Sequence, residues 1–208
     1  MEDREMLKGI ETFATALAAK EPVPGGGGAA ACVGALAAAL CSMVGNYSTG
    51  KKAYAAVEPD IRRMLAAATA ARMRLLELVQ EDADAFLPLS RAYAIPRDDP
   101  SRAETLEEVT KWACAAPLEM MRQTCLVIEL LEEMGEKGSR MLLSDVGVGA
   151  LLARAALEAA SLNVFVNTRA LTSRAFAEIT EAEVDEMLEA YVPRAELLAA
   201  SVMGQLRG

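Results

Sequence analysis

The feature that most constrains this chain is a run without a single charged residue, from position 22 to position 50. It opens as "PVPGGGGAAACVGALAAAL" and ends in the polar letters "NYSTG". The run is long enough to cross a bilayer, which takes about 20 apolar residues. It consists mostly of Ala and Gly, however, with few of the Leu, Ile and Phe residues that favour insertion. A helix surrounded by other helices explains the run better, and we predict a buried helix over 26–48.

Helical periodicity continues along the rest of the chain, and the alternation typical of strands is nearly absent. Aromatic residues make up only 4% of the chain, whereas Ala, Leu, Met and Glu dominate, which favours helices over sheets. We predict the other helices over about 3–20, 59–95, 101–138, 145–171 and from 180 onward. Their predicted starts are Pro59 in a first turn, Ser144 as an N-cap, and two capping boxes, Ser101 with Glu104 and Thr180 with Glu183.

The predicted fold is a single all-α domain over residues 1–208. It is a bundle of about six mostly long helices, with the Ala-rich helix buried at its centre. So much apolar helix surface is hard to bury within one subunit. We therefore expect a homodimer, whose two-fold interface completes the core.

Charge and residue content argue against several classes of function. The formal net charge of −9 disfavours a nucleic-acid partner, which needs a basic face. The chain has no histidine, so acid–base chemistry must rest on other groups, and we expect no metal. The cysteines lie in apolar contexts without a C-x-x-C pair, as in reduced cytosolic proteins. The N-terminus has no apolar signal core, so we expect a cytoplasmic protein without a membrane partner.

The glycine turn and the lysines that follow the buried helix are two candidate binding elements. Gly25, Gly26, Gly27 and Gly28 precede a helix, where unpaired N–H groups can cradle an anion or a carbonyl. The turn matches neither a Walker loop nor a Rossmann fingerprint, so a purely structural turn is an equal alternative. Lys51 and Lys52 are the first charges after the neutral run. They are either solvated helix-end lysines or a clamp for a carboxylate tail.

The segment "VQEDADAF" provides the candidate for proton transfer. Val79 and Phe86 continue an apolar helical stripe, and this spacing puts Asp82 on or beside the buried face. A carboxylate in that position has a raised pKa unless it is paired, which prepares a general acid for work near neutral pH. A structurally paired carboxylate is the alternative.

The predicted helix over 145–171 carries further polar candidates. Asp145 lies in its first turn, where the helix dipole favours an acidic residue even without a function. Asn163 and Asn167 are four residues apart and share a face with small residues. Because buried amides must be hydrogen-bonded, they either tie helices together or recognise heteroatoms of a ligand.

Together these segments resemble the formiminotetrahydrofolate cyclodeaminase and methenyltetrahydrofolate cyclohydrolase family. Its members carry P-x-P-G-G-G-S and then a small-residue helix that ends in G-[KR]-[KR], and this chain reads "PVPGGGG" and later "STGKK". The family's D-A-[DE]-A-F segment is matched by "DADAF" and its V-P-L-E bend by "APLE". Its S-D helix start with a later N-V-x-[IV]-N is matched by "SDVG" and "NVFVN". The order and spacing hold from about residue 5 to residue 190.

The resemblance implies an all-helical homodimer that acts on a one-carbon tetrahydrofolate derivative. It implies Asp82 and Asp145 as catalytic positions, with Asp82 moving a proton. The glycines and asparagines would orient the pterin or the one-carbon bridge, and Lys51 and Lys52 would hold the glutamate tail. Either water adds to a methenyl bridge, or a formimino group closes the ring and releases ammonia. The sequence leaves both open.

One position departs from the family pattern, because Gly28 stands where the family has serine. If that hydroxyl holds ligand or a water molecule, its loss alters or abolishes activity. A catalytically inactive folate-binding or scaffolding dimer is therefore the alternative interpretation.

Overall fold

The computed structural model describes the backbone of residues 5–208 and the side chains from residue 8 onward. Within this range the regular structure is helical throughout, so the predicted all-α class is confirmed. The α-helices are α1 (Glu5–Ala18), α2 (Gly26–Ser48), α3 (Glu58–Tyr93), α4 (Arg102–Ala113), α5 (Ala115–Lys137), α6 (Leu143–Ala170) and α7 (Arg174–Arg207). Two short 3-10 turns, η2 (Lys52–Val57) and η3 (Arg140–Leu142), precede α3 and α6.

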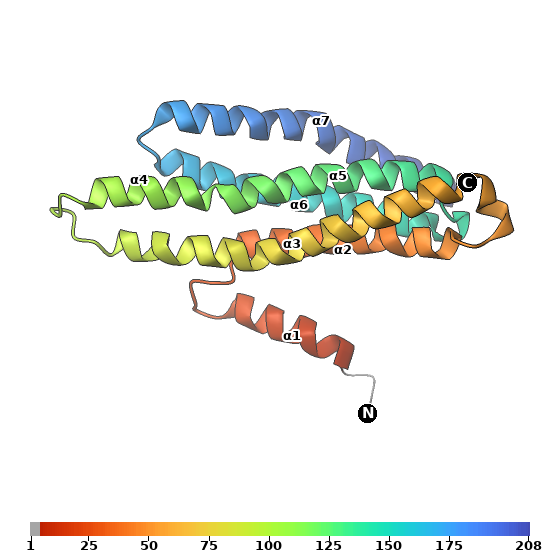
Figure 1. Cartoon of the computed structure of the whole chain (residues 1–208), viewed down its shortest axis with the longest axis horizontal. Helices are drawn as coiled ribbons and strands as arrows, with labels where there is room; N and C mark the ends of the chain where they lie inside the picture. Colours follow the sequence, from red (N-terminus) through yellow and green to blue (C-terminus); the bar gives the residue numbers. More distant parts are fainter. Residues whose placement is uncertain (1–4) are drawn as a thin grey trace.

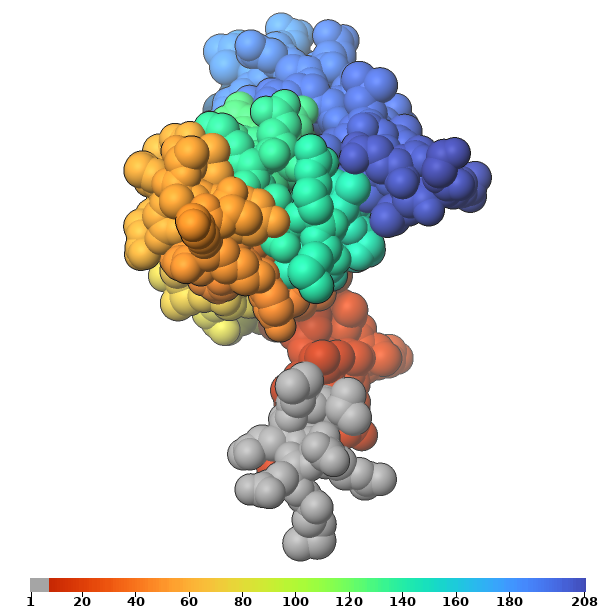
Figure 2. Space-filling view, turned by 90° about the vertical axis from the view of Figure 1, so that its right-hand side faces the viewer, coloured from red at the N-terminus to blue at the C-terminus, as the bar shows by residue number. Residues whose placement is uncertain are grey.

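The long helices run side by side, and α2 packs against α3, α5 and α6 (Figure 1). α2 and α6 are antiparallel, because Gly26 at the start of α2 faces Asn163 late in α6, whereas Val44 near its end faces Gly138 just before α6. α4 and α5 follow each other along the bundle with Cys114 between them. α7 covers α6, and α1 stands apart from the bundle (Figures 1 and 2).

Small residues along α2 let its neighbours approach closely, and larger side chains from those neighbours fill the core. A Cβ on Gly45 would lie 2.9 Å from both Leu65 Cγ and Met134 Cε, so a larger residue there would require these side chains to shift. The largest fully buried side chains are Ile61, Met64, Leu75, Leu78, Met120, Met121, Ile128, Leu131, Met134, Leu157, Val44 and Val127. Each large aliphatic side chain stabilises the fold by about 1.5–3 kcal/mol. The predicted buried helix over 26–48 is confirmed.

The predicted helix start at Ser101 is confirmed, because α4 begins at Arg102, but its side-chain capping bond is absent; the predicted starts at Ser144 and Thr180 are wrong. Ser101 lies at the start of α4 but has helical dihedral angles, and its Oγ donates to Asp99 Oδ1 at 2.7 Å. Ser144 lies within the first turn of α6, which begins at Leu143. Thr180 lies inside α7, where its hydroxyl donates to Phe176 O at 2.9 Å, a bond common within helices. The predicted helix over 101–138 is two helices, α4 and α5.

The charge-free run meets the length and composition of a membrane span. Within the described part of the chain, Gly26–Ser48 and Arg140–Ala170 both do so. In α2, however, 61% of the most apolar window is buried among the other helices. A core helix in a bundle meets the same criterion, so this finding is weak support for a membrane span.

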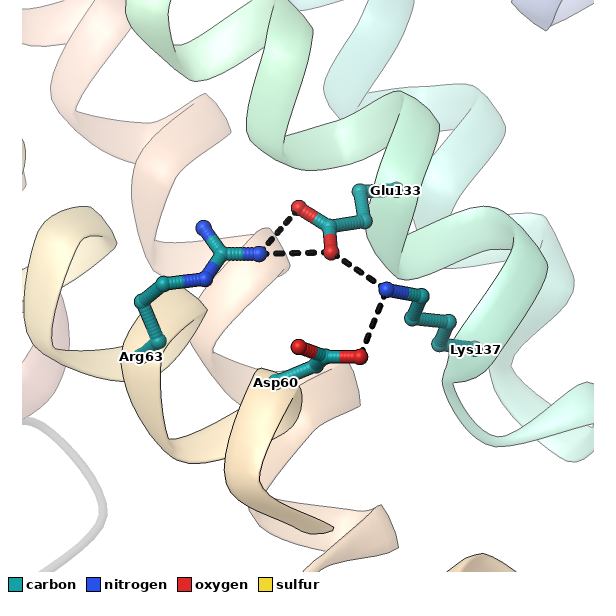
Figure 3. A network of polar contacts seen from close by, with 4 residues as sticks. All are labelled: Asp60, Arg63, Glu133 and Lys137. Carbon is teal, nitrogen blue, oxygen red and sulfur yellow. Dashed lines mark hydrogen bonds and ion pairs between the residues drawn. The ribbon is translucent and has the colours of Figure 1, made fainter. Parts of the chain in front are cut away.

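A network of ion pairs joins the start of α3 to the end of α5 (Figure 3). Lys137 Nζ donates to Asp60 Oδ2 at 2.6 Å and to Glu133 Oε1 at 2.7 Å, and Arg63 pairs with the same Glu133 carboxylate. These side chains are partly exposed, so the network adds little to the free energy of unfolding. It does hold α3 against α5 at the end of the bundle where the connection from α2 emerges.

Candidate active site

A cavity of about 230 Å³ lies at the N-terminus of α2. Its walls come from the 22–27 turn, the middle of α3, the end of α4 and the last part of α6. The lining residues are Pro22, Val23, Gly25, Gly26, Gly27, Asp82, Phe86, Ala113, Asn163, Val166 and Asn167. The fold therefore brings the glycine turn, Asp82 and the two asparagines to one place.

Asp82 lies directly against the first turn of α2. A Cβ on Gly27 would be 2.5 Å from Asp82 Oδ2 and 2.6 Å from Asp82 Cγ, which is closer than real Cβ atoms come. Glycine at position 27 thus allows the carboxylate to reach the helix backbone. The Asp82 side chain is half-buried, as the apolar stripe of α3 predicted.

The surroundings of Asp82 change its acidity. Burial raises the pKa of Asp82 above its ordinary value of 3.8, and a hydrogen bond from the Gly28 backbone N–H opposes this with a smaller effect. A poorly solvated carboxylate is a stronger base, and its protonated form persists closer to neutral pH. Asp82 can therefore accept a proton when ionised or donate one when protonated.

The N-terminus of α2 also faces the cavity. Gly25 is the N-cap residue, and no side chain caps the helix there. The first intrahelical bond runs from Ala29 N to Gly25 O at 3.1 Å, so the N–H groups of Gly26 and Gly27 have no carbonyl partner within the helix. Both residues line the cavity. Their N–H groups can bind a carbonyl or an anion, which is the cradle interpretation of this turn.

Gly28 is directed away from the cavity. A Cβ at this position would make ordinary contacts with Pro24 Cβ and Val79 Cγ1, each at 3.5 Å. Gly28 is also absent from the residues that line the cavity. A serine side chain at position 28 would therefore begin behind the glycine turn, between the turn and α3.

Each asparagine is held by a hydrogen bond. Asn163 Nδ2 donates to Ala159 O at 2.9 Å, and its Oδ1 faces Gly26, 3.5 Å from where a Cβ would stand. Asn167 Nδ2 donates to the carbonyl oxygen of Ala113, which is the last residue of α4, at 3.0 Å. Asn167 thus ties α6 to α4, whereas Asn163 Oδ1 faces the turn that borders the cavity.

The bond to Ala113 depends on a proline in the next helix. In an uninterrupted α-helix, the Ala113 carbonyl would accept the N–H of the residue four positions later. That residue is Pro117, which has no N–H. The carbonyl is therefore available for Asn167.

The sequence analysis did not identify Phe86 and Val166, which form an apolar wall of the cavity, as site residues. Phe86 lies one turn after Asp82 on α3, and Val166 lies one turn after Asn163 on α6. Both were indistinguishable from core residues in the sequence. Their exposed fractions of 39% and 64% show that they are not core residues. Their positions one helical turn from polar candidates were the signal that could have found them.

The remaining predicted site residues lie at the opposite end of the bundle. Lys51 and Lys52 follow the C-terminal end of α2, which has 23 residues and is therefore about 34 Å long at ~1.5 Å per residue. Asp145 lies in the first turn of α6, about 27 Å along the helix axis from Asn163 at the same rise. Within one subunit, these three residues do not share the cavity with Asp82.

A family model described as formiminotransferase-cyclodeaminase matches residues 9–186. This chain belongs to the formiminotransferase-cyclodeaminase family. One relative is a methenyltetrahydrofolate cyclohydrolase of Methylorubrum extorquens, which is 42% identical over 183 residues, covering 86% of this chain and 88% of the relative.

Two further relatives of this formiminotransferase-cyclodeaminase family member match it at lower identity. The formimidoyltransferase-cyclodeaminase of Mus musculus is 32% identical, and the match covers 95% of this chain but only 36% of the mouse protein. A crystal structure of a formiminotetrahydrofolate cyclodeaminase from Thermotoga maritima matches with a TM-score of 0.83 at 29% identity. That match covers 92% of this chain and 95% of the other.

The expected absence of a metal and the individual residue roles stay predictions for this member of the formiminotransferase-cyclodeaminase family. Among the residues that the structure describes, no group of three or more His, Cys, Asp or Glu side chains is placed to hold a metal ion. The geometry brings Gly25, Gly26, Gly27, Asp82 and the asparagines together. Their chemical roles follow only from the proposal below.

Proposed function

We propose that this protein is a methenyltetrahydrofolate cyclohydrolase, which adds water to the cationic methenyl bridge and yields 10-formyltetrahydrofolate. The observation that carries the proposal is Asp82, a half-buried carboxylate with a raised pKa in a cavity beside free backbone N–H groups. The Methylorubrum extorquens relative, which is 42% identical to this chain, is named for this activity, and this likeness also supports the proposal.

Asp82 supplies the base in this reaction. Its ionised form attracts the cationic bridge and accepts a proton from the water that attacks the methenyl carbon. General acid–base catalysis of this kind contributes about 10²–10⁴-fold to the rate. The resulting tetrahedral carbon carries a hydroxyl group and lies between N5 and N10 of the folate. Asp82 then returns its proton to N5 as the carbon–N5 bond breaks, the hydroxyl proton is lost to solvent, and the formyl group stays on N10.

The cavity accommodates only part of the substrate. Its volume of about 230 Å³ falls below the roughly 300–1,000 Å³ of typical small-molecule pockets. Phe86 and Val166 provide apolar surface for the flat ring system, while Asn163 and the α2 N–H groups provide polar partners. The benzoyl-glutamate tail then extends beyond the cavity.

Cyclodeaminase activity is the second candidate, because the Thermotoga maritima structure has that activity in its title and shares the fold at 29% identity. In this reaction the protonated form of Asp82 would donate its proton to the nitrogen that leaves as ammonia. The same raised pKa supports this role. The inactive-dimer alternative rested on the missing serine hydroxyl, and position 28 lies outside the cavity lining.

We also propose that the protein is a homodimer that pairs through one face of α2 and α6, the α2/α6 face. α2 and α6 pack against each other and against α5, and both helices carry exposed apolar side chains. The exposed apolar residues of this face are Leu36, Tyr47, Val148, Leu151, Leu162 and Val166, with 48–68% of each exposed. Exposed apolar side chains on two neighbouring helices are typical of an interface.

An absorbance assay tests the proposed activity, because the methenyl bridge absorbs in the near ultraviolet where the other folate forms do not. We expect the purified protein to remove this absorbance from the methenyl compound faster than buffer does, and Asp82→Asn to lose most of that rate. A gain of absorbance from the formimino compound, with ammonia release, would instead establish the cyclodeaminase. Neither change, with tight folate binding, would support the inactive alternative and refute the proposal.

A further inference from the structure

α1 packs very little against its own subunit. Figures 1 and 2 show it projecting from the bundle. From residue 8 to residue 18, every residue of α1 is exposed except Phe13, which is half-buried. A helix of this length, 14 residues, is only marginally stable in water on its own. We therefore expect another surface to cover α1.

The larger exposed apolar side chains of α1 lie along one stripe. Ile10, Ala14 and Leu17 follow one another at spacings of four and three residues, so they share a helix face. Ile10 is 65% exposed and Leu17 is 37% exposed. A stripe of this spacing, the α1 stripe, is typical of a helix that packs against a partner surface.

The α1 stripe does not face its own bundle. A gap of about 620 Å³ lies between α1 and α3, and α1 borders it with Gly9, Thr12, Phe13 and Ala16, together with Lys8. None of the three stripe residues lines this gap. If the bundle of the same subunit were the surface that covers α1, the most apolar side of the helix would face the gap.

The connection from α1 to α2 holds the helix in this outward position. It contains Pro22 and Pro24, whose rings fix their own φ angles and also restrict the residues before them, Glu21 and Val23. Because this segment is stiff, it resists a movement that would turn the α1 stripe back onto α3. The chain therefore presents the stripe to another molecule.

A second copy of the chain is the molecule that lies within reach. Residues 19–25 join α1 to α2 and span at most about 25 Å. α2 forms one side of the α2/α6 face, to which we assign the homodimer contact, so α1 is attached at the edge of that face. A copy that packs on the face lies beside α1, and two-fold symmetry lets each copy extend its α1 onto the other.

The same connection forms part of the Asp82 cavity. Val23 lines both this cavity and the gap beside α1, and Pro22 lines the cavity next to it. A contact that fixes the position of α1 therefore also fixes one wall of the cavity.

We propose that α1 is an arm that packs the α1 stripe against a second copy of this chain, and that this contact holds the Pro22–Val23 wall of the Asp82 cavity in place. The inference rests on the proposed homodimer. It adds a contact outside the α2/α6 face and gives that contact an effect on the cavity.

Hydrogen exchange at two protein concentrations tests the arm contact. Sedimentation first establishes one concentration at which the protein is a dimer and one at which it is a monomer. If a second copy covers α1, the amides of residues 8–18 should exchange at least about tenfold more slowly in the dimer. If α1 instead packs against its own bundle, the exchange rates are the same at both concentrations, and the inference is wrong.

A double variant tests the side chains of the stripe. Ile10→Glu/Leu17→Glu places two charges on it, and the bundle should still fold because both residues are exposed within one subunit. We expect the dimer Kd to rise about tenfold or more. At a concentration where the variant is still a dimer, KM for the methenyl compound should rise about threefold with little change in kcat. Ile179→Glu, at a residue of α7 that is 74% exposed, should change neither quantity.

The outcomes separate this inference from the earlier proposals. A dimer whose α1 amides exchange as fast as those of the monomer would overturn the arm but leave the homodimer intact. A protein that is monomeric at every concentration would refute both. An unchanged KM in the double variant would remove the link to the cavity wall. Exchange and sedimentation use no substrate, so the cyclohydrolase proposal is tested independently by the absorbance assay.

Discussion

Gly27 and Asp82 are packed so closely that a single methyl group cannot be placed between them. A Cβ at position 27 would lie 2.6 Å from Asp82 Cγ. This contact joins the N-terminus of α2 to the middle of α3 and sets where the carboxylate stands. The glycine turn therefore positions the Asp82 carboxylate, to which we assign proton transfer, and also directs N–H groups toward the cavity.

Gly27→Ala should displace Asp82 and reduce the rate. A misplacement of about 1 Å costs on the order of 10²-fold in rate, and overpacking destabilises a fold by about 1–3 kcal/mol. Steady-state kinetics and thermal unfolding check both effects. Gly204→Ala is the control, since a Cβ there meets nothing within 4 Å and the residue lies outside the cavity lining. Equal rates for the two variants would contradict the positioning role.

Gly28→Ser should leave catalysis nearly unchanged. Position 28 faces Pro24 and Val79 at 3.5 Å, so the restored hydroxyl would begin outside the cavity. We expect kcat/KM to change by less than about tenfold, equivalent to ~1.4 kcal/mol of activation free energy. A larger gain, measured with the methenyl substrate, would show that the hydroxyl reaches the substrate after all.

Asp82→Asn should stabilise the protein against heat at neutral pH. The folded-state pKa of Asp82 is raised above 3.8, so the folded state favours the protonated form. Wild-type stability is therefore highest below the unfolded pKa and decreases as pH rises through the folded pKa. Asp82→Asn does not ionise, so its stability does not decrease with pH for this reason. Melting curves between pH 3 and pH 8 should show a difference in Tm that vanishes at the acidic end, and a constant difference would contradict burial as the cause.

Glu107→Gln should have the opposite pH dependence. The N–H of Thr172 donates to Glu107 at 2.8 Å and the N–H of Ser173 at 3.0 Å, at the start of α7. The Thr172 N–H, then Lys111 and the Ser173 N–H, lower the pKa of Glu107 to about 2. This stabilisation is present above pH 4.5 and is lost as pH falls toward 2.

The Glu107 variant should thus melt at a lower temperature than wild type at pH 7, with the difference shrinking below pH 4.5. Glu108→Gln provides the comparison, because Glu108 is exposed on the same helix. If the two variants show the same decrease in Tm relative to wild type, the hydrogen bonds from Thr172 and Ser173 are not the cause of the decrease.

If the protein pairs through the α2/α6 face as proposed, Leu36→Glu should convert the dimer into monomers. The residue is 52% exposed in one subunit and lies near the middle of α2, so a two-fold interface would bury two like charges near its axis. We expect the dimer Kd to rise on the order of 10²-fold or more, as measured by sedimentation. Leu206→Glu, at the end of α7, should leave the oligomeric state unchanged.

Parts of the fold and of the site could be predicted because their physical cause is local. The lack of charge over residues 22–50 predicts α2 to within a residue. The spacing of Val79 and Phe86 predicts the face on which Asp82 lies. Helix starts were less predictable, because Ser144 and Thr180 have the composition of a cap but helical surroundings decide their conformation.

The distances between motifs could not be predicted from their order. Lys51 and Asp82 are close in the sequence, but α2 and α3 are antiparallel neighbours and carry them to opposite ends. Phe86 and Val166 were missed because an apolar residue that borders a cavity has the same pattern as one in the core.

Pro117 controls the site without touching it. Because this residue cannot donate an N–H, the Ala113 carbonyl is left for Asn167. Any residue with an N–H at position 117 would let the backbone compete for that carbonyl, release the Asn167 amide into the cavity and loosen α6 from α4. The shape of this pocket therefore depends partly on the N–H that Pro117 lacks. A search restricted to residues that line the cavity would overlook this determinant.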